Sequence, residues 1–352
     1  MTRVFSGIRP SGRLHLGNYL GAIKNWITLQ EKHDCIYAIV DYHAITTPFS
    51  PEELRENVRE VALDYLAVGL DPKRATLIVQ SQVPEHVELG WIFQSISPVS
   101  WFERVPTYKE KIVQHPEYVN LGLLAYPALM AADILIYKAD LVPVGEDQLP
   151  HIELTNMIAR RFNRMFASPS RHSERSEESR GSRDGILRRS TPQDDSTGFF
   201  PPVKAELTHG ARIMSLKDPK KKMSKTGDEG VALSDSSDEV RQKIKTAVTD
   251  SGREIKSGND KPALTNLLTI YSEVSGLPIS KLEKQYAGKG YAEFKAGLAE
   301  AVVKFLEPIQ KRRRELEKKK GYVEEVLDAG SKKARPIAQK TLEEVKKKMG
   351  LT

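Results

Sequence analysis

Two short segments, far apart in the chain, carry side chains suited to binding a polyphosphate. The first, Pro10–Asn18, follows the apolar stretch Val4–Gly7 and runs into a helical pattern that begins near Gly17. The N-terminus of a helix presents unpaired backbone N–H groups to an anion. The second segment, Lys221–Thr226, supplies three lysines, which attract phosphate charge. Together the two segments predict chemistry on ATP.

Within these segments, four side chains are the candidate catalytic residues: His15, Asn18, Lys222 and Lys225. His15 and Asn18 lie three residues apart, on one face of the first helical turn, and both can donate hydrogen bonds to phosphate oxygens. Gly17 allows a nucleotide to lie against the backbone. A structural histidine beside a glycine turn, or a lysine-rich surface loop, would explain either segment alone, but finding both in this order favours a nucleotide site.

Length and composition indicate a two-domain globular protein. The chain has 352 residues, of which 39% are hydrophobic and 29% charged. Met1–Gly7 lacks the apolar run of a signal peptide, so a cytoplasmic location is expected. The most apolar stretch, Leu121–Tyr137, contains Pro127 and Asp133 and therefore predicts a buried helix and no membrane span. Cys35 is the single cysteine, which excludes an internal disulfide and a multi-cysteine metal site, and no metal-binding residues are predicted.

The first half alternates short apolar runs with helical periods, which predicts a parallel sheet with crossover helices. A helix is expected between Ser50 as N-cap, with Pro51 in its first turn and Glu53 completing a capping box, and Gly69 as terminator. The expected strands are Val4–Ser6, Cys35–Val40, Thr76–Gln80 and Leu141–Val144.

Composition divides the chain into four parts. Residues 168–198 hold 8 Ser, 6 Arg and 6 Asp or Glu and almost no large aliphatic side chain, so a low-complexity, disordered insertion is expected there. We assign 1–167 and 199–233 to the catalytic domain, the latter with the mobile lysine segment. Residues 234–352, rich in Lys, Glu, Leu and Ala, predict a helical domain.

The excess positive charge lies at the C-terminal end. Lys311–Thr352 contains 14 Lys plus Arg against 7 Asp plus Glu, a difference of +7, which equals the net charge of the whole chain. A solvated helical face would explain such a run. A contact with a phosphate backbone is the alternative.

Several further motifs make a family resemblance specific. The chain resembles the bacterial-type tryptophanyl-tRNA synthetases, which are class I aminoacyl-tRNA synthetases, over Val4–Phe166 and from Gly210 to the end. The motifs are Phe5-Ser6-Gly7-Ile8-Arg9-Pro10-Ser11-Gly12, Val40-Asp41-Tyr42-His43-Ala44-Ile45-Thr46, Tyr126-Pro127-Ala128-Leu129-Met130-Ala131-Ala132-Asp133-Ile134-Leu135, Val144-Gly145-Glu146-Asp147-Gln148 and Ala211-Arg212-Ile213-Met214-Ser215-Leu216. The resemblance implies an α/β fold, a Rossmann-type doubly wound parallel sheet followed by an α-helical anticodon-binding domain, and a homodimer.

The resemblance also implies the reaction. L-Tryptophan attacks the α-phosphate of ATP, pyrophosphate leaves, and the adenylate is transferred to tRNA(Trp), with Mg²⁺ bound through the ATP phosphates. No protein nucleophile is needed, because alignment and charge stabilisation suffice. The implied ATP contacts are Arg9, Pro10, Ser11, Gly17, Asn18, Gly145, Glu146, Asp147, Ile213, Lys222, Met223, Ser224, Lys225 and Thr226, of which the segment Lys222–Thr226 closes over the phosphates.

Asp133 is the candidate specificity residue. Tyr126, Met130 and Asp133 fall at i, i+4 and i+7, so one helix face presents all three to the same pocket. A carboxylate among apolar neighbours needs a donor, and the resemblance supplies the indole N–H of tryptophan. A structural partner in the protein is the alternative. The implied pocket also includes Gln148, Phe5, Gly7, Val40 and His43.

Three other functions remain open. A tyrosyl-tRNA synthetase shares the fold and both nucleotide motifs, but typically carries Gln where Met130 stands. A catalytically silent paralogue could bind RNA through the basic tail, although His15, Lys222, Lys225 and Asp133 are intact. A small nucleotidyltransferase would not need the long helical domain.

Overall fold

The structure is a computed structural model that describes residues 1–166, 198–207, 212–224 and 229–352. In this part of the chain, five parallel strands form one sheet in the order β3-β2-β1-β4-β5. The strands are β1 (Arg3–Ile8), β2 (Asp34–Ile39), β3 (Ala75–Val79), β4 (Leu141–Val144) and β5 (Lys204–Leu207). The first four confirm the predicted strands to within two residues at each end. The fifth was not predicted, because its sequence Lys-Ala-Glu-Leu is neither apolar nor rich in β-branched residues.

Helices connect the strands and follow them. The helix predicted after Ser50 is confirmed as α4 (Pro51–Val68), which Gly69 ends with φ of 113°. Ser50 Oγ accepts the Glu53 N–H at 3.4 Å, but the carboxylate that Ser50 contacts is that of Glu52, so the predicted capping box is only half formed. The helix predicted in Leu121–Tyr137 is α8 (Leu121–Leu135), which continues through Pro127. The other α-helices are α1 (Leu16–Asn18), α2 (Lys24–Leu29), α3 (Asp41–Ala44), α5 (Glu85–Ile96), α6 (Val99–Glu103), α7 (Pro106–Gln114), α9 (Leu149–Met165), α10 (Ser237–Thr246), α11 (Pro262–Ser275), α12 (Ile279–Gln285), α13 (Tyr291–Glu317) and α14 (Tyr322–Met349).

Apolar side chains cover both faces of the sheet. Along β2, Tyr37 packs into the cluster beneath α2 and α4, whereas Ala38 packs into the cluster beneath α5, α8 and α9. This alternation follows from the two-residue period of a strand, and burial on both faces explains why β2 is apolar after its first residue, Asp34. The buried free thiol of Cys35 is one of these core groups.

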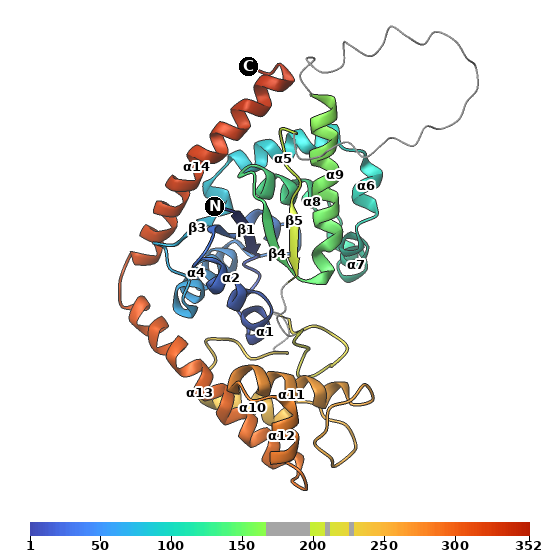
Figure 1. Ribbon diagram of the computed structural model, residues 1–352, viewed down its shortest axis with the longest axis vertical. Coiled ribbons are helices and arrows are strands. Elements are labelled where there is room, and N and C mark those ends of the chain that lie inside the picture. The colour runs from blue at the N-terminus through green and yellow to red at the C-terminus, as the bar shows by residue number, and fades with distance from the viewer. Residues whose placement is uncertain (167–197, 208–211, 225–228) are drawn as a thin grey trace, which may run out of the picture.

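The second half of the described chain is helical. Figure 1 shows α10, α11 and α12 as a lobe beneath the sheet, with α13 running from this lobe to the side of α4. We call α10–α12, together with the first half of α13, the helical lobe. The buried side chains of the lobe and those between α4 and the sheet form one cluster, to which Leu298 of α13 and Leu63 of α4 both belong. Among the helices that the structure describes, none is long and apolar enough to span a membrane.

The last helix, α14, packs against the edge strand β3 and against α5. Gly330 on α14 lies so near the backbone of Leu77 that a β-carbon at Gly330 would overlap the Leu77 carbonyl group. Ion pairs join Arg335 to Glu85 at 2.8 Å and Lys346 to Glu88 at 2.5 Å. Part of the positive charge in the tail therefore faces the protein.

The predicted insertion, 168–198, lies outside the described residues except for Gly198, but its flanks are close together. The Asn163 side chain near the end of α9 accepts the Phe200 N–H at 3.0 Å and donates to the Phe200 carbonyl at 2.8 Å. Because a short connection can span adjacent ends, we expect deletion of 168–198 to leave turnover within about three-fold. Steady-state aminoacylation by the shortened chain measures this. A loss of turnover far beyond that range would show that the insertion takes part in catalysis.

Candidate active site

The strand order places the candidate site at one edge of the sheet. β1 lies between β2 and β4, so the order reverses at β1, and open α/β sheets bind ligands at the carboxyl ends of the strands at this point. The turn Arg9–His15, which we call the nucleotide turn, follows β1, and Gly145 follows β4. The predicted ATP-binding segments that contain Pro10 and Gly145 are 135 positions apart in the sequence. They therefore meet where the order of the strands reverses.

The turn after β1 is closed by a reciprocal cap. His15 Nδ1 accepts the Asn18 N–H, and Asn18 Oδ1 accepts the His15 N–H, each at 3.2 Å. Because Nδ1 is an acceptor, the proton of the neutral imidazole lies on Nε2. His15 and Asn18 thus shape the turn, and the donor groups that they can offer to a phosphate are the Nε2–H and the side-chain amide.

The lysine segment contacts this turn through Met223. A β-carbon on Gly17 would lie 3.0 Å from His15 Nδ1 and 3.3 Å from the Met223 β-carbon, so only glycine leaves both neighbours in place. Met223 is buried, and its N–H donates to the carbonyl of Ile213 at 3.1 Å. Ile213 is also buried. Met223 therefore anchors the segment beside the nucleotide turn.

Lys222 extends from this anchor to the segment after β4. Its Nζ lies 2.6 Å from Asp147 Oδ1, and both side chains are about half exposed. Burial raises the pKa of Asp147, but the hydrogen bond and charge of Lys222 outweigh this and lower the pKa below its usual value. The predicted contacts Lys222 and Asp147 are thus brought together, while Lys225 and Thr226 lie outside the described residues.

The remaining predicted ATP contacts surround the same edge. Ser11 donates its N–H to the Arg9 carbonyl at 2.9 Å and is exposed, and Pro10 beside it is buried. Glu146 is exposed after β4, and Ser224 is half-buried beside Met223.

Asp133 is almost fully buried, with 1% of its surface exposed, and accepts hydrogen bonds from three side chains. Gln80 Nε2 lies 2.8 and 2.9 Å from the two carboxylate oxygens, His86 Nδ1 lies 2.6 Å from Oδ1, and His43 Nε2 lies 2.8 Å from Oδ2. Burial alone would raise the pKa of Asp133, but the hydrogen bonds from His43 and His86 lower it to about 2. The carboxylate is therefore ionised and held in a fixed orientation.

Sequence reasoning had placed His43 in the pocket but missed Gln80 and His86. They lie 53 and 47 positions from Asp133, and neither stands in a motif that points to it. Gln80 follows β3 directly, which is the one available signal, because polar residues at the carboxyl end of a parallel strand face the ligand edge. His86 also binds the Tyr137 hydroxyl through Nε2 at 2.7 Å, so its ring is held on both sides.

Tyr126 connects the Asp133 pocket to the nucleotide turn. Its hydroxyl lies 2.7 Å from His151 Nε2, and its ring meets that of His43 edge-on at 6.0 Å. Burial raises the pKa of Tyr126, whereas a hydrogen bond from Thr107 and the charge of Arg9 act against the rise. Arg9 of the turn is thus close enough to act on a side chain of the pocket.

The other predicted pocket residues border the same region. Phe5 in β1 stacks on Tyr137 with ring centroids 5.7 Å apart, and Met130 is half-buried on α8. A β-carbon on Gly7 would lie 2.9 Å from Val40 Cγ1, which requires glycine there. Gln148 is half-buried and donates to Asp147 at 3.0 Å.

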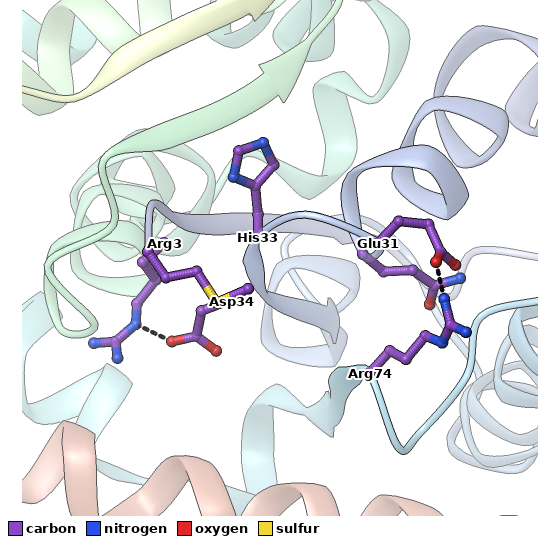
Figure 2. A pocket seen from close by; sticks show the side chains of 7 residues that line it. Arg3, Glu31, His33, Asp34 and Arg74 are labelled. Carbon is purple, nitrogen blue, oxygen red and sulfur yellow. Dashed lines mark hydrogen bonds and ion pairs between the residues drawn. The ribbon is translucent and has the colours of Figure 1, made fainter.

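A separate hollow lies at the opposite edge of the sheet, at the amino ends of β1 and β2 (Figure 2). Its charged side chains bind one another: Arg3 Nε lies 2.8 Å from Asp34 Oδ2, and Arg74 binds Glu31. The hollow contains none of the predicted site residues. The nucleotide turn is therefore the better candidate.

His151 gives the site a testable response to pH. Burial lowers its pKa to about 4, with a smaller contribution from His43. In the unfolded chain a histidine has a pKa near 6.5, so as the pH falls the unfolded state takes up a proton before the folded state does. The free energy of unfolding therefore decreases as the pH falls from about 6.5 to 4, by about 3 kcal/mol in total, since each pH unit costs about 1.36 kcal/mol. We expect His151→Gln to flatten the stability profile over this window in urea denaturation. His33→Gln, at the far edge of the sheet, is the control, and an unchanged slope in His151→Gln would contradict the assignment.

Comparison with known proteins agrees with this geometry. A sequence model of the class I tRNA synthetases for tryptophan and tyrosine matches residues 1–307. The tryptophan–tRNA ligase of Wolinella succinogenes is 44% identical, over 99% of this chain and 98% of its own length. The crystal structure of tryptophanyl-tRNA synthetase from Mycoplasma pneumoniae is similar, with a TM-score of 0.82, 33% identity, and coverage of 100% of this chain and 98% of that one. The corresponding structure from Campylobacter jejuni, complexed with ADP and tryptophan, has a TM-score of 0.79, 30% identity, and coverage of 99% and 100%.

Proposed function

The chain belongs to the class I tRNA synthetases of the tryptophan and tyrosine group, and we propose that it activates L-tryptophan with ATP and transfers the product to tRNA(Trp). The full-length relative at 44% identity favours tryptophan over tyrosine. The observation that supports this function best is the meeting of two sites at one edge of the sheet. The nucleotide turn lies after β1, and the Asp133 pocket is bordered by β1 and by the residues that follow β2 and β3.

The reaction requires alignment and charge stabilisation. The carboxylate of tryptophan attacks the α-phosphorus of ATP, the bond to the bridging oxygen breaks, and pyrophosphate leaves; the terminal ribose of tRNA then attacks the carbonyl of the adenylate and releases AMP. His15 Nε2–H, the Asn18 amide and the lysines of Lys222–Thr226 are the proposed donors to the phosphates. Donors fixed before the reaction stabilise the developing charge without reorganisation.

Tryptophan would be recognised through the indole N–H. The carboxylate of Asp133 has about four acceptor positions, and Gln80, His86 and His43 already occupy both oxygens. We propose that the indole N–H replaces His43 at Oδ2, because His43 also borders Tyr126 in the pocket. A substrate without an N–H at this position could displace His43 only by breaking its hydrogen bond to Oδ2 without replacing it, and would therefore be rejected.

Mg²⁺ is proposed to enter with ATP. Among the described residues, no group of three or more His, Cys, Asp or Glu side chains could hold a metal ion. Asp147, the carboxylate beside the nucleotide turn, is bound to Lys222. The residues present therefore fit a metal held by the ATP phosphates, where it would neutralise phosphate charge.

The tRNA is proposed to contact the helical domain, for which we keep the boundaries 234–352. Lys318, Lys319 and Lys320 are exposed where α13 ends, and they form the densest exposed cationic run in the tail that the structure describes. Such a run suits a phosphate backbone. The other boundaries, 1–167 and 199–233 for the catalytic domain, remain predictions, and because the proposed acceptor is tRNA we propose the cytoplasm as the location.

A homodimer is proposed on the resemblance and on an exposed apolar surface. Trp91 on α5 has 68% of its surface exposed, Val87 lies one turn before it, and Val99 at the start of α6 is also exposed. A contiguous exposed apolar surface typically marks a protein interface. We expect Trp91→Glu to convert a dimer into a monomer in size-exclusion chromatography with light scattering. Val248→Glu in the helical lobe is the control, and a Trp91→Glu protein that stays dimeric would place the interface elsewhere.

Pyrophosphate exchange with each of the twenty amino acids tests the function directly. We expect exchange with tryptophan alone, followed by charging of tRNA(Trp). Exchange with tyrosine would support the tyrosyl alternative, and no exchange with any amino acid would support the silent RNA-binding paralogue.

A further inference from the structure

Arg313 on α13 is a buried cation within an exposed basic run. Its neighbours Arg312 and Arg314 are exposed, whereas Arg313 has 7% of its surface exposed. Its guanidinium binds Asp64, reaches both carboxylate oxygens of Glu60 at 2.7 Å, and binds Glu317 at 3.1 Å. Burying a guanidinium is unfavourable unless it is paired and hydrogen-bonded. This contact is therefore a specific attachment of α13 to α4.

Asp64 lies between Arg313 and the nucleotide turn. It lies on α4 with no exposed surface; burial raises the pKa of its carboxyl group to about 6, while Arg313 and, to a smaller extent, the nearby backbone N–H of Leu14 act against the rise. Leu14 is itself fully buried and immediately precedes His15. Arg313 thus reaches the residue before the candidate catalytic histidine through one intermediate side chain.

Gln310, one helical turn before Arg313, provides a second connection. Its Nε2 donates to the carbonyls of Leu233 and Asp235, at 3.1 and 2.8 Å. The segment that contains Leu233 pairs with the turn on both sides of His15: the Leu233 N–H donates to the Leu14 carbonyl, and the Leu16 N–H donates to the Val231 carbonyl, both at 2.8 Å.

Asp235 strengthens the same connection. It has no exposed surface, and its Oδ1 lies 3.3 Å from Arg13 Nη1. Its Oδ2 accepts the Ala232 N–H at 2.8 Å and lies 2.7 Å from Lys243 Nζ. Two routes from one face of α13 therefore end within residues 13–16, and both pass through buried groups.

We propose that Arg313 and Gln310 are positioning residues through which the helical lobe sets the geometry of the nucleotide turn, and thereby the binding of ATP. The proposal rests on the proposed function of the turn. Neither residue contacts the candidate substrate groups; both act through Asp64 and the segment 231–235. Since α13 begins in the lobe and ends against α4, a change in its angle moves both connections together (Figure 1).

Tryptophan-dependent pyrophosphate exchange tests this with Gln310→Leu and Arg313→Met. Each variant removes donors from α13 and leaves the turn, the lysines and the Asp133 pocket unchanged in sequence. We expect the KM for ATP to rise about ten-fold while the KM for tryptophan changes less than two-fold, and we expect Arg313→Lys to restore part of the loss. A purely structural role would instead lower the fraction of active sites, which active-site titration measures, and leave both KM values unchanged.

Arg241→Met is the matched control. Arg241 on α10 forms an ion pair with Glu300 of α13 at 2.7 Å, but this pair lies on the surface and does not reach the turn. Its KM for ATP should equal that of the parent. If Arg313→Met does not fold, Gln310→Leu decides the question alone. An unchanged KM for ATP in folded Gln310→Leu, or an equal rise for both substrates, overturns the proposal, whereas absence of exchange in the parent protein would overturn the proposed function instead.

Discussion

Asp133→Asn should lower kcat/KM for tryptophan on the order of 100-fold and reduce discrimination between tryptophan and tyrosine. The amide keeps the shape of the carboxylate but loses its charge and one acceptor oxygen. Three buried donors, from Gln80, His43 and His86, then compete for the remaining oxygen, and the indole N–H has no charged acceptor. The measurement is pyrophosphate exchange with both amino acids.

Asp133→Ala is the harsher variant and should also destabilise the fold. Alanine leaves the three donors without their acceptor in a buried site, at a cost of about 1–3 kcal/mol for each unsatisfied group. Asp140→Asn, an exposed carboxylate that accepts the Arg3 N–H, is the control. If folded Asp133→Asn discriminates between tryptophan and tyrosine as well as the parent, Asp133 has only a structural role.

Lys225→Ala should slow adenylate formation about 100- to 1000-fold with little change in ATP affinity. The reason is that a lysine which contacts the phosphates mainly in the transition state lowers the barrier without strengthening ground-state binding. The buried anchor Met223 and the Lys222–Asp147 pair hold the start of this segment beside the turn. Single-turnover kinetics separates the rate of the chemical step from the dissociation constant of ATP.

The control for this prediction is Lys220→Ala. Lys220 is exposed in the same loop, and its N–H is bound to Asp218 at 3.0 Å. A Lys225→Ala enzyme that binds ATP weakly but reacts at the parent rate would show that Lys225 contributes to ground-state binding only.

Local patterns were sufficient to predict most of the fold. The α4 helix was predicted because its cap, its first-turn proline and its terminal glycine are adjacent in sequence to the helix that they bound. β4 was predicted at the observed residues because it is a short apolar run between a turn and a glycine. β5 was missed because its place in the sheet depends on pairing with β4, which no local signal records.

The residues of the candidate site likewise fall into those that local sequence patterns predict and those that only the fold brings together. The nucleotide turn is one contiguous segment, so its residues could be named together. The partners of Asp133 come from the segments after β2 and β3 and could be found only in three dimensions. Arg313 looked like one member of a solvated basic run, and that interpretation is wrong for it, because the acidic side chains that bury it lie about 250 positions away.

The contact between α14 and β3 has a consequence for how the chain is made. A strand at the edge of a sheet exposes unpaired backbone groups that can pair with another chain. Translation runs from the N-terminus, so β3 leaves the ribosome long before α14, whose Gly330 touches Leu77. The nascent chain therefore carries an uncovered strand edge until its last helix is complete. A chain terminated before α14 would keep that edge permanently open, and we infer that it would be removed by chaperones and proteases.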